Sequence, residues 1–418
     1  MAQIKNKIHF AWFVLIGLCI TVGLGKAGLN NTSGLFISPI SEDLGIGVGN
    51  LTLYLSISAI VTMVFLPIGG KIMAKYDARI VLTVAILLQA GSFAAFGFMN
   101  SVWGWYIFSI PLAVGGVFIT VISGPILIQR WFKKRSGMAL GIMTAIGGLL
   151  GAFTQPIVGS LISNFGWRSA YYTVGIAVII IVVPTILLLL RKSPEAKGLR
   201  PYGVDAEAKD THADSQLSGI AFEDAKKTPA FLLLAVFFFI ITAVSSFTIH
   251  IPTYLVGQGY SVNFAGNMMA SLMIGVFIGS LLFGYLSDRI GAKKTSLLAM
   301  ILGLISMGLL LGFPDFVPAL VISLVLFGFV TSSIGTIAPE ITAALFGSRD
   351  YSRIYSTASM GLAIASIIAL PAYGYIFDFT GSYAAALYVI LAMFLMNIVF
   401  IIGAFRDKEK LVQQGLWK

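Results

Sequence analysis

Cysteine is nearly absent from this chain, and charged residues are scarce. The 418 residues include a single cysteine, Cys19, only three histidines, and 11 % charged residues. One cysteine excludes a disulfide within the chain and argues against a zinc site, so we expect neither a metal nor a cofactor. Hydrophobic residues make up 58 %, more than a soluble chain of this length can bury. Such a composition is typical of a protein that crosses the membrane many times.

A nucleotide-binding loop is also missing. No stretch matches G-x-x-x-x-G-K-[ST], so an ATP-driven mechanism has no support. Glycines recur instead at short spacing inside apolar runs such as "GVFIGSLLFG". Small residues at that spacing let membrane helices approach closely and slide, so we expect helices that move rather than an enzyme.

Membrane-length runs of apolar residues follow one another along the chain. A helix needs about 20 such residues to cross the hydrocarbon. The first run is too long for a signal-peptide core, and a second follows, so we expect it to be retained. The twelve predicted spans lie near 9–34, 49–73, 79–99, 103–129, 136–163, 168–190, 228–256, 264–287, 294–313, 316–343, 353–376 and 381–405.

The polar interval 191–227 divides the spans into two sets of six. We predict bundles over 1–190 and 228–405, a cytoplasmic linker over 191–227, and a cytoplasmic tail over 406–418. The halves repeat, because Gly70 precedes Gly284 by 214 residues and Arg135 precedes Arg349 by the same number. Two such halves facing each other form a cleft, and rocking of one on the other gives alternating access.

Lysine and arginine gather in alternate loops. With both termini in the cytoplasm, nearly all of them fall in cytoplasmic loops, which is the positive-inside pattern of a plasma-membrane protein. Only Lys26 and Arg168 depart from it. The net charge of +10 therefore reflects topology and not nucleic-acid binding. The loop residues are Lys71, Lys75, Arg79, Arg130, Lys133, Lys134, Arg135, Arg289, Lys293, Lys294, Arg349 and Arg353.

The loop "GYLSDRIGAK", residues 284–293, resembles a signature of the major facilitator superfamily. The resemblance implies an all-α polytopic fold of twelve transmembrane helices in two pseudo-symmetric six-helix bundles. The first-half copy, "GKIMAKYDAR", is degenerate, with Ala74 where an acid is expected and Asp77 where a glycine is expected. Asp288 and Arg289, at a helix end, are predicted to latch the halves in one state.

Four further motifs are similar to the branch of monocarboxylate transporters and oxalate–formate antiporters. They are "FAWFVLIG", "RWFKKRSGMALGI", "FGWRSAYY" and "SPEAKGLRPYG". The branch implies a carrier of small organic anions that works by proton symport or anion exchange. Its helix 8 arginine and preceding aspartate are here Ser280 and Val276, and its helix 11 lysine is here Ala363. An exporter of drugs or other metabolites is the alternative, and a transport-dead ligand sensor is a third.

Lys26 is the candidate for recognition of the anion. It lies fourteen residues past Trp12, about 21 Å along a helix, where a charge costs at least roughly 2.5 kcal/mol unless it faces a cavity. One hypothesis is a lysine that snorkels outward over Asn30 and Asn31. The other is a cavity-facing cation that replaces the missing arginine, with both asparagines beside it.

The remaining candidates would shape the site or gate it. His250 is interpreted either as a cap at the outer end of helix 7 or as a residue that carries a proton, a role that Lys26 also offers. Its companions at the substrate site are predicted to be Gln155, Tyr355 and Ser359. Further lining residues are predicted at Tyr54, Asn267, Ser271 and Ser356. Arg130 and Glu340 are predicted to gate, with Asp288 and Arg289. The expected partners are a small organic anion, protons and the lipid bilayer, and we expect a monomer.

Overall fold

The computed structural model describes residues 9–132, 135–203, 219–415 and 417. The predicted loop residues Lys133 and Lys134, and the centre of the linker, lie outside them. The described chain is helical apart from turns, short connections and two isolated bridges. The all-α prediction is therefore confirmed for this part of the chain.

The first half holds α1, η1 and α2 in one crossing, followed by α3, α4, a crossing of α5, η3 and α6, and the long α7. Each crossing is a continuous or nearly continuous helix. The bounds are α1 Phe10–Leu24, η1 Gly25–Asn30, α2 Ser33–Leu44, α3 Val48–Lys75, α4 Ala78–Ala95, η2 Phe96–Phe98, α5 Val102–Gly116, η3 Val117–Ile122, α6 Ser123–Trp131 and α7 Ser136–Leu189.

The second half repeats this plan after a connection that contains η4 (Glu195–Lys197) and α8 (Phe222–Ala225). Its first crossing comprises α9, η5 and α10, and its fifth comprises α14 and α15. The bounds are α9 Pro229–Ser246, η5 Phe247–Ile249, α10 Ile251–Gly257, α11 Val262–Ile290, α12 Ala292–Gly312, α13 Val317–Phe346, α14 Tyr351–Ala358, α15 Met360–Thr380 and α16 Ala384–Gln413.

Gly166 accounts for the number of spans. In the described residues, eleven helical segments are long and apolar enough to cross a membrane. One of them, α7, contains 54 residues but is broken at Gly166, where φ is 79° and ψ is 161°. Glycine adopts this conformation at little cost. The break divides α7 into limbs of membrane length, 136–165 and 167–189, and the second limb supplies the twelfth span.

Two helices run further than their sequence suggested. The first crossing continues from η1 through α2 to Leu44, beyond the expected end at 34, because residues 33–38 are buried. The last helix continues to Gln413, through most of the predicted tail. Its extension is rich in good helix formers and meets no glycine until Gly415, where φ is 71°.

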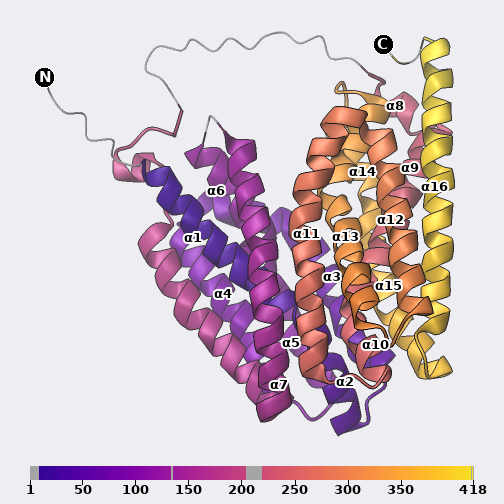
Figure 1. The fold of residues 1–418 in the computed structure, drawn as a ribbon. Coiled ribbons are helices and arrows are strands. Elements are labelled where there is room, and N and C mark those ends of the chain that lie inside the picture. The colour runs from indigo at the N-terminus through magenta and orange to yellow at the C-terminus, as the bar shows by residue number, and fades with distance from the viewer. Residues whose placement is uncertain (1–8, 133–134, 204–218, 416, 418) are drawn as a thin grey trace, which may run out of the picture.

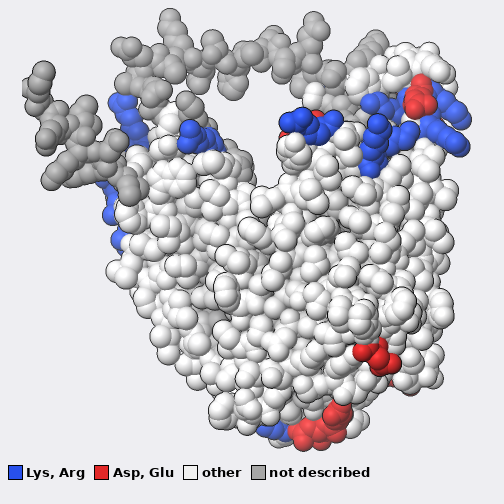
Figure 2. Space-filling view, viewed as in Figure 1, with Lys and Arg blue, Asp and Glu red and all other residues white. Residues whose placement is uncertain are grey.

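The halves meet at one end and separate at the other (Figure 1). We call the end at Leu44–Val48 and Thr380–Tyr383 the closed end, and the end at Lys75–Ala78 and Ile290–Ala292 the open end. Figure 2 shows the cleft between the halves at the open end, where Lys and Arg gather, and acidic residues at the closed end. Contacts of α3 with α15 and of α7 with α11 join the halves.

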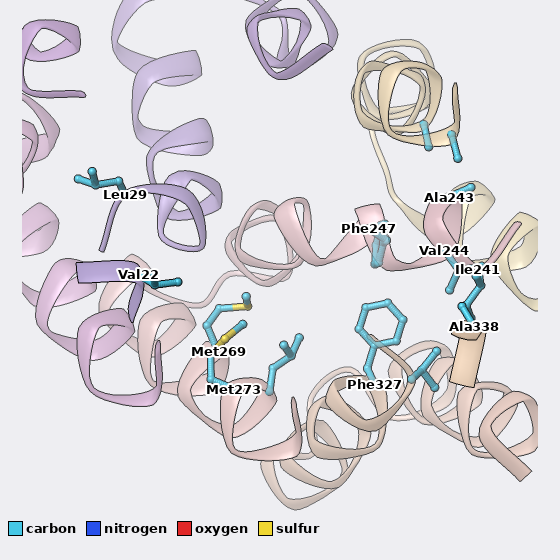
Figure 3. Close-up of a cluster of buried hydrophobic side chains, with 14 of the residues drawn as sticks. Val22, Leu29, Ile241, Ala243, Val244, Phe247, Met269, Met273, Phe327 and Ala338 are labelled. Atoms are coloured by element: carbon cyan, nitrogen blue, oxygen red, sulfur yellow. The ribbon is translucent and has the colours of Figure 1, made fainter. Parts of the chain in front are cut away.

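Glycines let these helices touch across the halves. A Cβ added at Gly374 of α15 would lie 2.7 Å from the Cα of Gly49 in α3. A Cβ added at Gly159 of α7 would lie 3.1 Å from the Cα of Gly266 in α11. Backbones approach this closely only where side chains are missing. In Figure 3, Met269 and Met273 of α11 lie between Val22 of the first half and Phe327 of the second.

Three of the four branch motifs converge at the open end of the first half. The ring of Trp12 lies 5.5 Å from that of Phe132 and 5.7 Å from that of Tyr202. The amide of Tyr202 donates to the carbonyl of Trp131 at 2.8 Å. These motifs therefore hold the start of the linker against the first and fourth crossings.

Candidate functional site

A cavity of about 360 Å³ lies between the halves, mainly within the first half. Its walls come from η1, α2, α3, α4, η2, α5 and η3, and its second-half side is formed by Ile249 and Leu370. The polar groups at its surface are one phenol, three hydroxyls of α3 and η3, one of α2 and two amides. These lining residues are Tyr54, Ser58, Thr62, Thr120, Ser33, Asn30 and Asn31.

Two π-helical segments, η1 and η3, pack against each other beside this cavity. In η1 the amide of Asn31 donates to the carbonyl of Lys26, five residues earlier, at 2.9 Å. A Cβ added at Gly25 would lie 2.6 Å from Cγ2 of Ile119 in η3, so glycine permits the contact. Helix segments of this type occur frequently at functional sites.

Lys26 is exposed, but it is not among the residues that line the cavity. Its neighbour Gly25 packs on η3, and Gly28 packs on the second limb of α7. The carbonyl of Ala27 accepts from Thr154 of the first limb of α7 at 3.1 Å. These contacts cover the other sides of η1, yet the Lys26 side chain is exposed. Among the described residues its ammonium has no hydrogen bond or ion pair.

Asn30 is exposed and, unlike Lys26, lines the cavity. Its Oδ1 accepts from Nε2 of Gln89 at 3.3 Å. That Nε2 also donates to the carbonyl of Gly25 at 3.2 Å. Gln89 comes from α4, is fully buried, and ties the third crossing to η1.

Asn31 and Gln155 lie at the boundary with the second half. Nε2 of Gln155 donates to the carbonyl of Asn31 at 2.8 Å. Nδ2 of Asn31 reaches Sδ of Met273 in α11 at 3.5 Å. Asn31 lines the cavity, whereas Gln155 is fully buried and supports η1 from behind.

His250, in the first crossing of the second half, is fully buried against the fifth crossing and the residue that precedes α16. Its Nε2 lies 2.8 Å from the carbonyl oxygen of Leu370, and its Nδ1 lies 2.8 Å from the hydroxyl of Tyr383. A carbonyl only accepts, so Nε2 carries the proton and Nδ1 accepts from Tyr383. The imidazole does not line the cavity, but its neighbour Ile249 and its partner Leu370 do.

Tyr355 and Ser359 lie in the fifth crossing of the second half, outside the cavity lining. The Tyr355 ring stacks on Tyr351, with 5.7 Å between centroids, and lies 5.9 Å from the ring of Phe238. Ser359 sits at the junction of α14 and α15, and its buried Oγ has no partner among the described residues. The structure thus keeps these two apart from Lys26.

The four predicted gating residues are at the open end. Arg130 donates to the carbonyl of Lys192 at 3.4 Å, and Arg289 lies over the ring of Tyr285 at 5.2 Å. Within the described chain, neither Asp288 nor Glu340 forms an ion pair. The halves are separated at this end of the structure. The gating role of these four residues therefore stays a prediction.

Sequence reasoning missed Gln89 and most of the hydroxyl lining. Gln89 is the sole amide in the third apolar run, and that is the signal that could have found it. Of the further lining residues that were predicted, Tyr54 lines the cavity, whereas Asn267, Ser271 and Ser356 do not. No group of three His, Cys, Asp or Glu side chains that could hold a metal occurs among the residues described.

Comparisons with known proteins add a family context. The family model described as Major Facilitator Superfamily matches residues 13–273 and 257–415. Monocarboxylate transporter 12 of Xenopus laevis is 23 % identical over 407 residues, which cover 92 % of this chain and 88 % of that protein. The uncharacterized MFS-type transporter YcxA of Bacillus subtilis is 24 % identical and covers 97 % of this chain and 98 % of its own length.

Solved structures share the fold. A bacterial homolog of the human lysosomal transporter Spinster, in an inward-facing and unoccupied conformation, aligns with a TM-score of 0.72 at 15 % identity. The alignment covers 98 % of this chain and 99 % of that structure. The nucleoside transporter NupG aligns with a TM-score of 0.73 at 13 % identity, over 94 % of this chain and all of that structure.

Proposed function

The chain belongs to the major facilitator superfamily, and from that premise we propose that it is a secondary active transporter of a small organic anion, a carboxylate. The observation that carries the proposal is Lys26, an exposed ammonium without a protein partner in the described chain, four residues before the cavity-lining Asn30. A cation inside the membrane is costly unless it faces water or a counter-ion. A substrate carboxylate supplies that counter-ion.

The cavity suits a small acid. Its volume of about 360 Å³ is at the lower end of the range for small-molecule sites. Asn30 and Asn31 supply amide groups next to the charge, while Leu29, Phe93 and Phe96 give an apolar wall for a hydrocarbon part. Lysine offers a single point charge without the fork of an arginine, so the carboxylate is held with less fixed geometry.

The other proposed residues act around this core. Gln155 fixes the backbone of η1, and His250 holds together the second-half elements that carry Ile249 and Leu370. Tyr355 and Ser359 approach the substrate only if the fifth crossing shifts when the open end closes. Arg130, Asp288, Arg289 and Glu340 gate that end.

We further propose that the open end faces the cytoplasm from the plasma membrane. The gathering of Lys and Arg at this end supports that orientation (Figure 2). Transport then proceeds by alternating access, with closure of the open end and separation of the closed end. Both coupling by anion exchange and coupling by proton symport are consistent with a site that holds one basic residue.

Flux measurements with the reconstituted protein test the proposal. Vesicles are loaded with labelled formate, acetate, propionate, oxalate, succinate or benzoate, and efflux is followed with and without an unlabelled acid outside. A requirement for the counter-anion indicates exchange, and dependence on a pH gradient indicates symport. Saturable flux of a neutral drug but of no acid favours the exporter, and binding without flux favours the sensor.

Lys26→Gln and Lys26→Ala test the site. Loss of a charged hydrogen bond of roughly 1.5–3 kcal/mol predicts a rise of about ten- to a hundredfold in the apparent KM for the acid. The matched control is Lys294→Gln, an exposed lysine at the open-end start of α12. If the Lys26 variants fold and transport the acid with normal KM, the lysine does not bind substrate and the proposed site is wrong.

A further inference from the structure

We infer that Gln89 is a positioning residue for the substrate, because it fixes which end of the Asn30 amide faces the cavity. The inference rests on the proposed function, since it concerns how that same site recognises an anion. Gln89 does not line the cavity itself. It acts through Asn30, which does.

The carbonyl oxygen of Gly25 determines the orientation of the Gln89 amide. One end of this amide lies 3.2 Å from the carbonyl oxygen of Gly25. A carbonyl oxygen only accepts, so the atom facing it must be the Nε2 donor. The same Nε2 lies 3.3 Å from the side chain of Asn30. The second proton of Nε2 is available for this contact, so Asn30 accepts the hydrogen bond through Oδ1.

The opposite end of the Asn30 amide then follows. With Oδ1 turned towards Gln89, Nδ2 and its two protons lie on the other side of the side chain. No described residue accepts from Nδ2, and Asn30 is exposed to the space between the halves. The cavity is thus presented with a donor on the side chain four residues from Lys26. A donor beside a cation favours a carboxylate, and the flipped amide would present an acceptor that repels it.

The Oε1 end of the Gln89 side chain does not stabilise the fold. The residue is fully buried, and its Oε1 has no hydrogen-bond partner among the described residues. An unpartnered buried oxygen costs about 1–3 kcal/mol, which an apolar side chain of the same shape would avoid. Gly115 of α5 lets that helix pack on the backbone of α4 beside Gln89, because a Cβ added there would overlap the carbonyl oxygen of Ala85. A buried amide that leaves its oxygen unpartnered while its nitrogen bonds Asn30 points to a role in orienting that neighbour.

The test is a double-mutant cycle on transport in proteoliposomes. The variants are Gln89→Met, Asn30→Ala and the pair, and the probe is whichever labelled acid of the panel has the highest flux. Methionine keeps the length of glutamine but donates no proton. We expect Gln89→Met to raise KM about tenfold with little change in maximal rate. In the Asn30→Ala background we expect the same substitution to change KM less than twofold, because its target has gone.

The control is Asn397→Leu, which replaces a buried amide of α16 in the other half with an apolar side chain. It should leave KM unchanged, and thermal unfolding of each purified variant separates loss of fold from loss of affinity. Gln89→Leu provides a second apolar variant if the methionine variant fails to fold. An unchanged KM in Gln89→Met, or an equal effect with and without Asn30, overturns the inference.

The two proposals fail in different ways. If no acid is transported, or Lys26→Gln transports it normally, the proposed function fails. If transport needs Lys26 but the cycle is additive, the anion site stands and only the role of Gln89 is wrong.

Discussion

The carboxylate of Asp378 in α15 accepts a hydrogen bond from the backbone amide of Gly49, 2.8 Å away in α3. It accepts a second bond of the same length from the amide of Val48. An acid from one half therefore caps the first turn of a helix of the other half, where free amides and the helix dipole favour a negative charge. This contact holds the closed end together.

Removing this carboxylate should release the closed end. For Asp378→Ala we expect the equilibrium to shift by about 2 kcal/mol away from the conformation seen here, because charged hydrogen bonds contribute this much. Spin labels at Glu42→Cys and Phe379→Cys, in a Cys19→Ser background, should report a longer distance. The control Asp315→Ala removes an exposed closed-end acid and should leave the distance distribution as it is. An unchanged distribution in Asp378→Ala would mean that other contacts suffice.

Gly374→Ala should act on the same contact by steric means. The added Cβ would lie 2.7 Å from the Cα of Gly49, and neither backbone can move aside alone. Overpacking of this kind costs about 1–3 kcal/mol, so we expect a lower midpoint of thermal unfolding or the same spin-label shift. Gly308→Ala is the control, because nothing lies within 4 Å of its added Cβ. Wild-type behaviour of Gly374→Ala in both measurements would contradict the close approach.

Ser56 and Pro371 should be coupled. Proline 371 has no N–H, which leaves the carbonyl of Ile367, four residues earlier, without its helical donor. Ser56 Oγ of the other half donates to this carbonyl at 2.6 Å. We expect Ser56→Ala to destabilise the closed end by about 1 kcal/mol, and by much less in Pro371→Ala, where the helix supplies its own donor. Spin-label distances across the closed end measure both, and equal effects in the two backgrounds would count against the coupling.

Docking of α8 on the second half should weaken in acid. Hydrogen bonding to Lys226 and the nearby charge of Arg353, 3.3 Å away, hold the pKa of the Glu223 carboxyl below its ordinary value. A lowered pKa contributes stability that is complete above the ordinary value of about 4.3 and is lost as pH falls through the lowered one. The protection of the Ile220 amide, which donates to the carbonyl of Phe346, against hydrogen exchange relative to an unstructured amide at the same pH should fall over that range.

Glu223→Gln should remove this pH dependence, since the neutral amide does not titrate. Asp224→Asn, one residue further along α8, is the matched control and should retain it. Persistence of the same acid response in Glu223→Gln would assign it to another group.

The crossings were predictable from sequence because each is a run of apolar residues longer than the hydrocarbon is thick. The ends of the helices were less predictable. Leu44 and Gln413 lie in polar surroundings, and only burial of α2 and the helix formers of α16 extend the helices there. The break at Gly166 was predicted, because one apolar run ends at 163 and the next begins at 168.

Some contacts of the candidate site were predictable from the sequence and others were not. Lys26 and Asn30 share one short segment, so their proximity followed from helical spacing. Gln89 reaches Asn30 from 59 residues away, and His250 finds Tyr383 at a separation of 133. Contacts between helices of this kind leave no local pattern. They depend on how crossings pack, which an apolar run does not encode.

The length of α3 also converts a small rotation at the closed end into a larger displacement at the open end. The helix is anchored at the closed end by Val48 and Gly49, contains 28 residues and reaches the open end at Lys75. At 1.5 Å per residue this arm is about 42 Å long. A tilt of about 10° about the anchored end moves its tip by about 7 Å. A tilt too small to break one turn of the helix is thus enough to change the width of the cleft at the open end by several ångströms.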